Sequence, residues 1–508
     1  MSKTPLQDLI VILPGIMGSV LQKDGQDLWN VSGSVLWQVA KSLGHRLTAL
    51  RLEGDDLLGG DLGDGITPTR LIQDTYLIPG LGGLGRVVDG YNRTSALITE
   101  HFQATPGDIY RDADDRAANF YHFPYDWRRD NRANAHILKK LLDKRLRRWR
   151  EASGNSNAKA ILLAHSMGGL ISRYYLEVLG GWQDCKALFT FGTPYRGSPS
   201  AVNVLANGLK KGPIDLGALL KLNEVLPSLT SIYQLMPRYK TLKIGADFYR
   251  VAQSPVPLPN IDPVKALDAL RFHDEIDDAA DANQNNPDYR SRFVTCPIVG
   301  VGQPTQQSVE LANGVIHLSD ALPTFLQDRP QLADGDSTVP QVSATPVQMN
   351  DLEMLARVDY IAESHGALQN QPDVLLNLLK GLQTAQTAPL EDARGALERV
   401  ARGQRSAVKG IGLSLEELYL INEPVTLRAK VSGTTAFNSV MAEIVCVSEE
   451  RPVMTQTLME EKGTWALGMD SLEAGLYCVK VYTDNSGAGA PNPVHQVFEV
   501  ADLESESP

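Results

Sequence analysis

A strand-turn-helix segment around Ser166 constrains the fold of this chain more than any other stretch. Ile161–Ala164 is an apolar run typical of a buried strand, and Ile171–Leu179 is typical of a helix. The turn between them must be very sharp, which holds the serine in a strained conformation with its oxygen projecting. Such a turn needs small residues two positions before and after the serine, and Ala164 and Gly168 meet this need, although glycine is more usual at the first position. The pattern predicts a nucleophile elbow, with an ordinary strand-helix turn as the alternative.

Further apolar runs alternate with helical patterns on both sides of this elbow. Helices are expected at Asn134–Glu151 and Pro372–Leu382. This alternation predicts an α/β fold, a mostly parallel sheet with helices on both faces, whose ligands bind at the carboxyl ends of the strands. Its other strands are expected at Leu9–Leu13, Ala118–Phe123, Leu188–Phe191, Phe293–Val301 and Arg357–Ala362.

Glycine-rich loops follow several of these strands. The first, Pro14–Ser19, can point backbone N–H groups into a site, and an elbow serine needs two such donors for an oxyanion. Met167, the residue after the serine, is one expected donor. Met17 or Ile16 is the other.

The remaining partners of a catalytic serine lie in loops beyond later strands. Asp336 and His365 follow Ser166 in the chain order of an α/β-hydrolase triad, with the aspartate orienting the histidine and the histidine acting as base. Asp334 is the alternative acid. An isolated histidine in a loop is usually inert, but the joint occurrence of the three residues in this order favours catalysis.

Two long segments interrupt the alternation. Residues 27–88 are predicted to form an irregular insertion. Its apolar residues, among them Trp29, Val35, Leu36, Trp37 and Tyr76–Ile78, either touch a lipid interface or pack inside. Residues 199–288, with helices expected at Leu216–Leu226 and Pro263–Asp281, are expected to form a cap or lid, with a static helical subdomain as the alternative. Asp126 and Arg128, which flank Trp127, are expected to pair as a structural clamp.

Beyond residue 383, apolar residues recur at every second position, which is the alternation typical of β-strands. We therefore predict an α/β-hydrolase domain at 1–383, a linker at 384–412, an immunoglobulin-like β-sandwich at 413–500 and a disordered acidic tail at 501–508. This sandwich carries no catalytic constellation, and we interpret it as a docking or stabilising module for a protein partner. Within it, Tyr477, Val479 and Val481 are expected to face inward. Cys478 would face the other way, so no Cys446–Cys478 disulfide is implied.

Composition narrows the function further. The net charge of -12 argues against a nucleic-acid surface, and the four separated cysteines show no metal-ligand spacing and fit a reducing compartment. The polar start leaves no room for a signal segment before Pro14, and no apolar run approaches the ~20 residues of a membrane span. These features predict a cytoplasmic protein, which would contact a membrane peripherally only if the apolar residues of the insertion at 27–88 touch lipid instead of packing inside.

An ordered series of motifs resembles that of the lecithin:cholesterol acyltransferase family, which includes lysosomal phospholipase A2 and phospholipid:diacylglycerol acyltransferases. The resemblance implies Ser166 as nucleophile, Asp336 as acid, His365 as base, and the Met17 and Met167 amides as oxyanion hole. Its Asp-x-x-Val spacing favours Asp336 over Asp334 as the acid. The motifs are PGIMGS (14–19), PYDWR (124–128), AHSMGG (164–169), GTP (192–194), GVGQPT (300–305), GDSTVP (335–340) and His365.

The resemblance further implies a lipid acyl hydrolase or O-acyltransferase that works through an acyl-enzyme and passes the acyl chain to water or an alcohol. No metal or organic cofactor is needed for this chemistry. Two departures bear on the substrate: the secreted relatives have a signal peptide and disulfides, and the Trp29–Leu81 stretch is only loosely similar to their membrane-binding segment. The alternatives are a small-ester esterase or peptidase on the same fold, and a catalytically silent lipid-binding scaffold.

Overall fold

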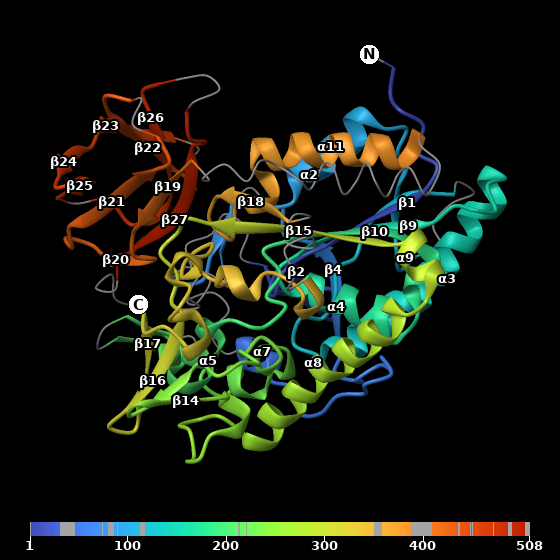
Figure 1. Cartoon of the computed structure of the whole chain (residues 1–508), viewed down its shortest axis with the longest axis horizontal. Helices are drawn as coiled ribbons and strands as arrows, with labels where there is room; N and C mark the ends of the chain where they lie inside the picture. The colour runs from blue at the N-terminus through green and yellow to red at the C-terminus, as the bar shows by residue number, and fades with distance from the viewer. Residues whose placement is uncertain are drawn as a thin grey trace.

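A seven-stranded parallel sheet forms the centre of the molecule in a computed structural model (Figure 1). The strand order is β18-β15-β10-β9-β1-β8-β7. The structure describes residues 2–30, 46–73, 75–79, 86–88, 90–111, 117–211, 214–219, 221–349, 358–387, 409–434, 437–447, 449, 451–470, 472–485 and 490–502. The strands are β1 (Leu9–Leu13), β7 (Pro106–Asp108), β8 (Phe120–His122), β9 (Ala160–His165), β10 (Cys185–Phe191), β15 (Val294–Val301) and β18 (Asp359–Ala362).

Helices cover both faces of this sheet. Successive side chains of a strand point to opposite faces, so in β1 Leu9, Val11 and Leu13 join one apolar cluster while Ile10 and Ile12 join another. In Figure 1, α2 and α11 lie on one side of the sheet, and α3, α4 and α8 lie on the other. The helices are α2 (Asn92–His101), α3 (Asn131–Ser153), α4 (Met167–Arg173), α5 (Pro199–Asn207), α6 (Leu216–Leu219), α7 (Thr230–Tyr233), α8 (Pro263–Gln284), α9 (Pro287–Arg292) and α11 (Pro372–Thr387).

The predicted fold class is therefore confirmed, and β7 is an additional short edge strand. One expected element is wrong: Leu216–Leu226 does not form a single helix. The described part of this stretch contains only α6 and the start of a 3-10 turn at Leu226–Ser228. Asn223 bonds back to the carboxylate of Asp215, which supports a folded-back path instead of a continuous helix.

The predicted irregular insertion at 27–88 contains ordered strands and buried aromatics. Trp29 and Tyr76 are 1% and 0% exposed, so in the described residues packing prevails over an interfacial position for these two side chains. Val35, Leu36 and Trp37 lie outside the described residues. Strands β3 (Gln26–Trp29) and β4 (Ile66–Leu71) pair with β2 (Ser19–Lys23), which precedes the insertion, in a three-stranded sheet of order β3-β2-β4. Strands β5 (Tyr76–Leu77) and β6 (Arg86–Val87) form a separate pair.

Residues 199–288, the predicted cap, and the chain that follows them also contain strands. A short pair, β11 (Lys210–Lys211) and β12 (Ile214–Asp215), precedes α6. A four-stranded sheet of order β14-β13-β16-β17 joins residues 242–249 to residues 308–319. Its strands are β13 (Leu242–Ile244), β14 (Asp247–Tyr249), β16 (Ser308–Ala312) and β17 (Val315–Ser319).

Strands β19 to β27 form two sheets at the C-terminal end, and we call them the C-terminal β unit. The sheets have the orders β19-β21-β25-β24 and β20-β27-β26-β22-β23 and share one apolar cluster. As predicted, Tyr477, Val479 and Val481 point into that cluster and Cys478 does not. The strands are β19 (Gly410–Ser414), β20 (Leu418–Leu420), β21 (Val425–Ser432), β22 (Val440–Cys446), β23 (Arg451–Thr457), β24 (Met459–Glu461), β25 (Thr464–Met469), β26 (Gly475–Thr483) and β27 (Val494–Ala501).

The predicted domain limits stay predictions. Helix α11 continues past residue 383 to Thr387, and β19 begins at Gly410, inside the predicted linker. Residues 388–408 and 503–508 lie outside the described ranges. Within the described ranges, no helix has the length and apolar character that crossing a membrane requires.

Candidate active site

Ser166 sits in a backbone conformation that few non-glycine residues adopt. Its φ is 50° and its ψ is -124°, between the end of β9 at His165 and the start of α4 at Met167. Such a conformation costs about 1–3 kcal/mol and persists only where the surroundings enforce it. Here the Ser166 N–H donates to the Phe191 carbonyl of β10 at 2.9 Å, which fixes the turn to the neighbouring strand.

The structure brings Ser166, Asp336 and His365 together. The Ser166 hydroxyl lies 2.9 Å from His365 Nε2, and His365 Nδ1 lies 2.7 Å from Asp336 Oδ2. An ionised carboxylate only accepts, so Nδ1–H donates to Asp336 and the free lone pair of Nε2 faces the serine hydroxyl. This tautomer is the one that a histidine base requires.

Asp336 and Asp334 occupy separate places in the same loop. Asp336 Oδ1 accepts the N–H groups of Thr338 and Val339, while its other oxygen accepts from His365. Asp334 instead accepts the Gly302 N–H at 2.9 Å, and burial raises the pKa of its carboxyl. Of the two candidate acids, Asp336 is the one in contact with the histidine.

Gly192 leaves the space in which the acid and the base meet. A Cβ atom at this position would lie 2.8 Å from Asp336 Oδ2 and 2.9 Å from His365 Nδ1. Its φ of 57° is also one that glycine adopts most readily. A side chain here would push the two groups apart.

Two residues whose roles the sequence did not reveal connect the base to the loop at Pro14–Ser19. His165 Nε2 lies 3.1 Å from the His365 carbonyl, its Nδ1 lies 3.1 Å from the Tyr91 hydroxyl, and that hydroxyl accepts the Gly15 N–H at 2.8 Å. The His365 carbonyl can only accept, so His165 carries its proton on Nε2. Burial, together with the charge of nearby His365, lowers the pKa of His165 to about 3, so it stays neutral. The only signal for His165 in the sequence is its place directly before Ser166 in the AHSMGG motif.

The PYDWR motif at 124–128 holds the same loop from its other side. The Tyr125 N–H donates to Ser19 Oγ, the Tyr125 hydroxyl to the Pro14 carbonyl, and the Trp127 indole N–H to the Ser19 carbonyl. Trp29 donates to the Met17 carbonyl and packs edge-on against Trp127 at 5.1 Å between ring centroids. The loop carrying the expected oxyanion donor is therefore tied down at several points.

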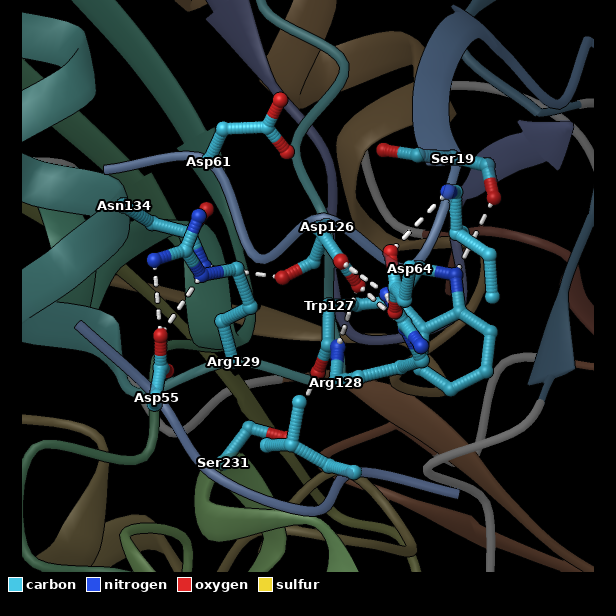
Figure 2. Close-up of polar contacts among 12 residues, drawn as sticks. Ser19, Asp55, Asp61, Asp64, Asp126, Trp127, Arg128, Arg129, Asn134 and Ser231 are labelled. Carbon is cyan, nitrogen blue, oxygen red and sulfur yellow. Dashed lines mark hydrogen bonds and ion pairs between the residues drawn. The ribbon is translucent and has the colours of Figure 1, made fainter. Parts of the chain in front are cut away.

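Buried charges hold the motif itself in place (Figure 2). Arg128 donates hydrogen bonds to both carboxylate oxygens of Asp126, at 2.9 and 2.6 Å, and to the Asp64 carboxylate at 2.9 Å. Arg129 binds Asp55 at 2.7 Å. The pairing of Asp126 with Arg128 around Trp127 has the geometry of the predicted clamp.

The two expected oxyanion donors belong to the elements that meet at the serine. Met167 is the first residue of α4, where a helix has no internal acceptor for the N–H group. Met17 has a φ of 60° in the loop after β1. That loop lies against the nucleophile, because a Cβ atom on Gly15 would come within 3.1 Å of Ser166 Cβ.

The three side chains of the site are buried. Ser166 and His365 are 1% exposed and Asp336 is 0% exposed. Across the described ranges, no group of three or more His, Cys, Asp or Glu side chains is placed to hold a metal ion.

The parallel sheet, its helices and the strained turn at Ser166 define the α/β-hydrolase class of folds. The chain belongs to the lecithin:cholesterol acyltransferase family, whose model matches residues 115–384. The resemblance seen in the motif series is thereby confirmed, and family membership points to a lipase-like hydrolase.

Comparisons with individual proteins add structural likenesses. No curated protein sequence matches the chain significantly. A lipase of Bacillus licheniformis in its mature form is 13% identical over 74% of this chain and 94% of its own, with a TM-score of 0.33. In its propeptide form it is 11% identical over 98% and 94%, again with a TM-score of 0.33. A CARDB domain of a Pyrococcus furiosus protein is 11% identical over 18% and 85%, with a TM-score of 0.14.

Proposed function

We propose that this protein is a serine-dependent lipid acyl hydrolase or O-acyltransferase with Ser166, Asp336 and His365 as its catalytic triad. The observation that carries the proposal is the 2.9 Å contact between the strained Ser166 and the Nε2 of His365. A general base needs this hydrogen-bond reach to the proton it removes.

The reaction proceeds in two steps. His365 takes the Ser166 proton as the serine oxygen attacks the ester carbonyl, and it then gives that proton to the leaving alcohol. The resulting acyl-enzyme is released by water in hydrolysis or by a second alcohol in transfer, with His365 again acting as base. Asp336 holds the imidazole in the tautomer that this sequence needs.

The amides of Met17 and Met167 are proposed to bind the oxyanion. The position of Met167 at the start of α4 supports its role, because the N–H groups at a helix N-terminus favour negative charge. The contact between the Gly15 loop and Ser166 supports the role of Met17. Losing one such donor costs about 10²–10³ in kcat in other serine enzymes.

The first prediction tests the nucleophile. Ser166→Ala should abolish labelling by a fluorophosphonate probe, because the probe reacts only with an activated serine. Ser172→Ala is the matched control: Ser172 is also buried on α4, but its hydroxyl is bonded to the Gly168 carbonyl at 2.8 Å. In-gel fluorescence of the full chain reads out both variants. Labelling that persists in Ser166→Ala would show that another serine is the nucleophile.

Two observations favour lipid esters over small esters. The family is named for lipid acyl transfer. In addition, Leu205, Leu229 and Ile232 of the proposed cap at 199–288 join the same apolar cluster as Met17 and Met167. A chain-length series of p-nitrophenyl esters should therefore show rising kcat/KM from acetate to longer chains, and a preference confined to acetate would favour the small-ester alternative. Incubation with a lipid extract and mass analysis of the products would then identify substrate and acceptor.

A further inference from the structure

Gln303, a residue of the GVGQPT motif, links the acid loop to the C-terminal β unit. Its side chain is buried and clamps one strand of that unit: Nε2 donates to the Ile411 carbonyl at 2.8 Å, and Oε1 accepts the Leu413 N–H at 3.0 Å. Its backbone N–H donates to the Gly335 carbonyl at 3.0 Å, next to Asp336. The position of the acid loop is thus coupled to strand β19.

A second link reaches the base loop. Ser364, the residue before His365, donates its hydroxyl to the His495 carbonyl of β27 at 2.6 Å. The buried Glu363 carboxylate accepts the N–H groups of both Ser364 and His495, at 2.8 and 3.2 Å. The loop that carries His365 is therefore hydrogen-bonded to β27 through Glu363 and Ser364, the two residues before the histidine.

Strand β19 packs closely against Gly302 and Ala362, with no room for side chains at its glycines. A Cβ atom on Gly412 would lie 2.5 Å from the Gly302 carbonyl oxygen, and one on Gly410 would lie 2.4 Å from Ala362 Cβ. Beside this contact, one apolar cluster joins Leu476 and Val497 of the β unit to Leu77, Val88 and Ala367. Figure 1 shows β19 and β27 at the end of the sheet beside β18, the edge strand from which the base loop emerges.

We propose that the C-terminal β unit is a positioning element for the active site, with Gln303 and Ser364 as positioning residues that fix the Asp336 and His365 loops. The proposal rests on the function proposed above. The β unit contacts Gln303, Glu363 and Ser364, which neighbour the acid and base, so it acts on the geometry of the triad. Because a displacement of about 1 Å in a catalytic group can cost on the order of 10²-fold in rate, docking of the β unit would control turnover.

Three variants of the full chain test this proposal. Gln303→Leu removes both amide hydrogen bonds, Ser364→Ala removes the hydroxyl bond to His495, and Gly412→Ala forces β19 away from Gly302. Gly468→Ala on β25 is the matched control, since a Cβ atom there meets nothing within 4 Å. Each variant is assayed well below its unfolding midpoint, which circular dichroism measures.

We expect kcat to fall by about tenfold or more in the three variants while KM stays within about twofold of wild type. Gly468→Ala should keep wild-type kcat. A readout that needs no turnover is the low-field ¹H resonance of the His365 Nδ1–H that Asp336 accepts: it should shift or broaden in the three variants and remain unchanged in the control.

The outcomes separate this inference from the proposed function. If the three variants unfold at lower temperature but keep kcat and the resonance, the β unit only stabilises the fold and the inference is overturned. If the wild-type chain neither hydrolyses esters nor reacts with the fluorophosphonate probe, the proposed function fails. The resonance then still decides whether the β unit sets the His365–Asp336 geometry.

Discussion

Single buried residues connect the groups of the candidate site. The Tyr91 hydroxyl is the clearest case, because it accepts the Gly15 N–H and meets His165 Nδ1. Since the His165 Nε2–H faces the His365 carbonyl, Nδ1 has no proton and the Tyr91 hydroxyl donates to it. One phenol therefore joins the oxyanion loop to the residue that supports the base.

Tyr91→Phe should reduce both stability and turnover. Losing the hydroxyl leaves the Gly15 N–H and His165 Nδ1 without this buried partner, and we expect a loss of about 1–3 kcal/mol in the free energy of unfolding. Urea unfolding and ester hydrolysis measure the two effects. Tyr121→Phe on β8, which loses one hydrogen bond to the Ala118 carbonyl, serves as control and should keep wild-type kcat. Equal kcat in both variants would contradict a role for Tyr91 in the site.

Buried histidines make the fold sensitive to acid. Burial, and to a smaller extent the charge of Arg238, lowers the pKa of His273 to about 3 from 6.5. Below pH 6.5 the unfolded chain binds a proton that the folded chain does not bind. His273 therefore contributes a loss of stability as pH falls from 6.5 towards 3, at about 1.4 kcal/mol per pH unit.

His273→Gln should make this pH dependence shallower. The glutamine amide can still donate to the Gln234 carbonyl that His273 contacts at 2.8 Å, but it takes up no proton. Urea unfolding at pH 7, 6 and 5 gives the slope, which should decrease by about 1.4 kcal/mol per pH unit below pH 6. Substitution of the exposed His317 by Gln is the control. An unchanged slope in His273→Gln would refute the prediction.

At the scale of elements, a loop after β8 determines where the loop after β1 lies. The PYDWR motif binds Pro14 and Ser19 through Tyr125 and Trp127, and the buried pair of Asp126 and Arg128 holds the motif. A buried ion pair need not stabilise a fold more than apolar residues of the same volume would. Breaking one is costly, because a charge is left buried without its partner.

Arg128→Met should lower the free energy of unfolding by about 3–5 kcal/mol. Arg70→Met is the matched comparison: Arg70 pairs with Asp27 at 2.7 Å, but their side chains are 49% and 32% exposed, so its loss should cost about 0–1 kcal/mol. Chemical denaturation measures both values. Similar costs for the two variants would show that burial does not govern the strength of the Arg128 clamp.

At the scale of the whole molecule, the C-terminal β unit has an apolar contact with the β5-β6 pair and with the loop that follows β18. Leu476 and Val497 are fully buried against Leu77, Val88 and Ala367, beside the hydrogen bonds of Gln303 and Ser364. We expect such a contact to make the two parts unfold together.

Val497→Asp should uncouple them. A carboxylate in the apolar cluster has to be hydrated or protonated, at a cost of several kcal/mol, and release of the β unit avoids that cost. Calorimetry of the wild type should show one thermal transition, and that of the variant should show two. Met459→Asp, at a side chain of β24 that is 73% exposed, should behave as the wild type. A single transition in Val497→Asp would mean that the cluster does not couple the two parts.

The sequence alone was enough for the elements that local patterns specify. The strands β1, β9 and β15 lie where the apolar runs indicated, and the small residues around Ser166 predicted the sharp turn. Apolar periodicity and turn chemistry act within a few residues, so they can be read without knowledge of the rest of the chain. The chain order of Ser166, Asp336 and His365 could likewise be read directly.

Only the tertiary structure decided which distant groups share a space. Trp29 and Tyr76 pack inside, and Tyr91 and His165 bridge two loops. Strand β19 begins within the predicted linker, where its glycines fit against Gly302 and Ala362. These outcomes depend on contacts between residues up to hundreds of positions apart, and no local pattern encodes such pairs. The sequence thus determined the sheet and the elbow, whereas packing between distant segments determined what holds the acid and base loops in place.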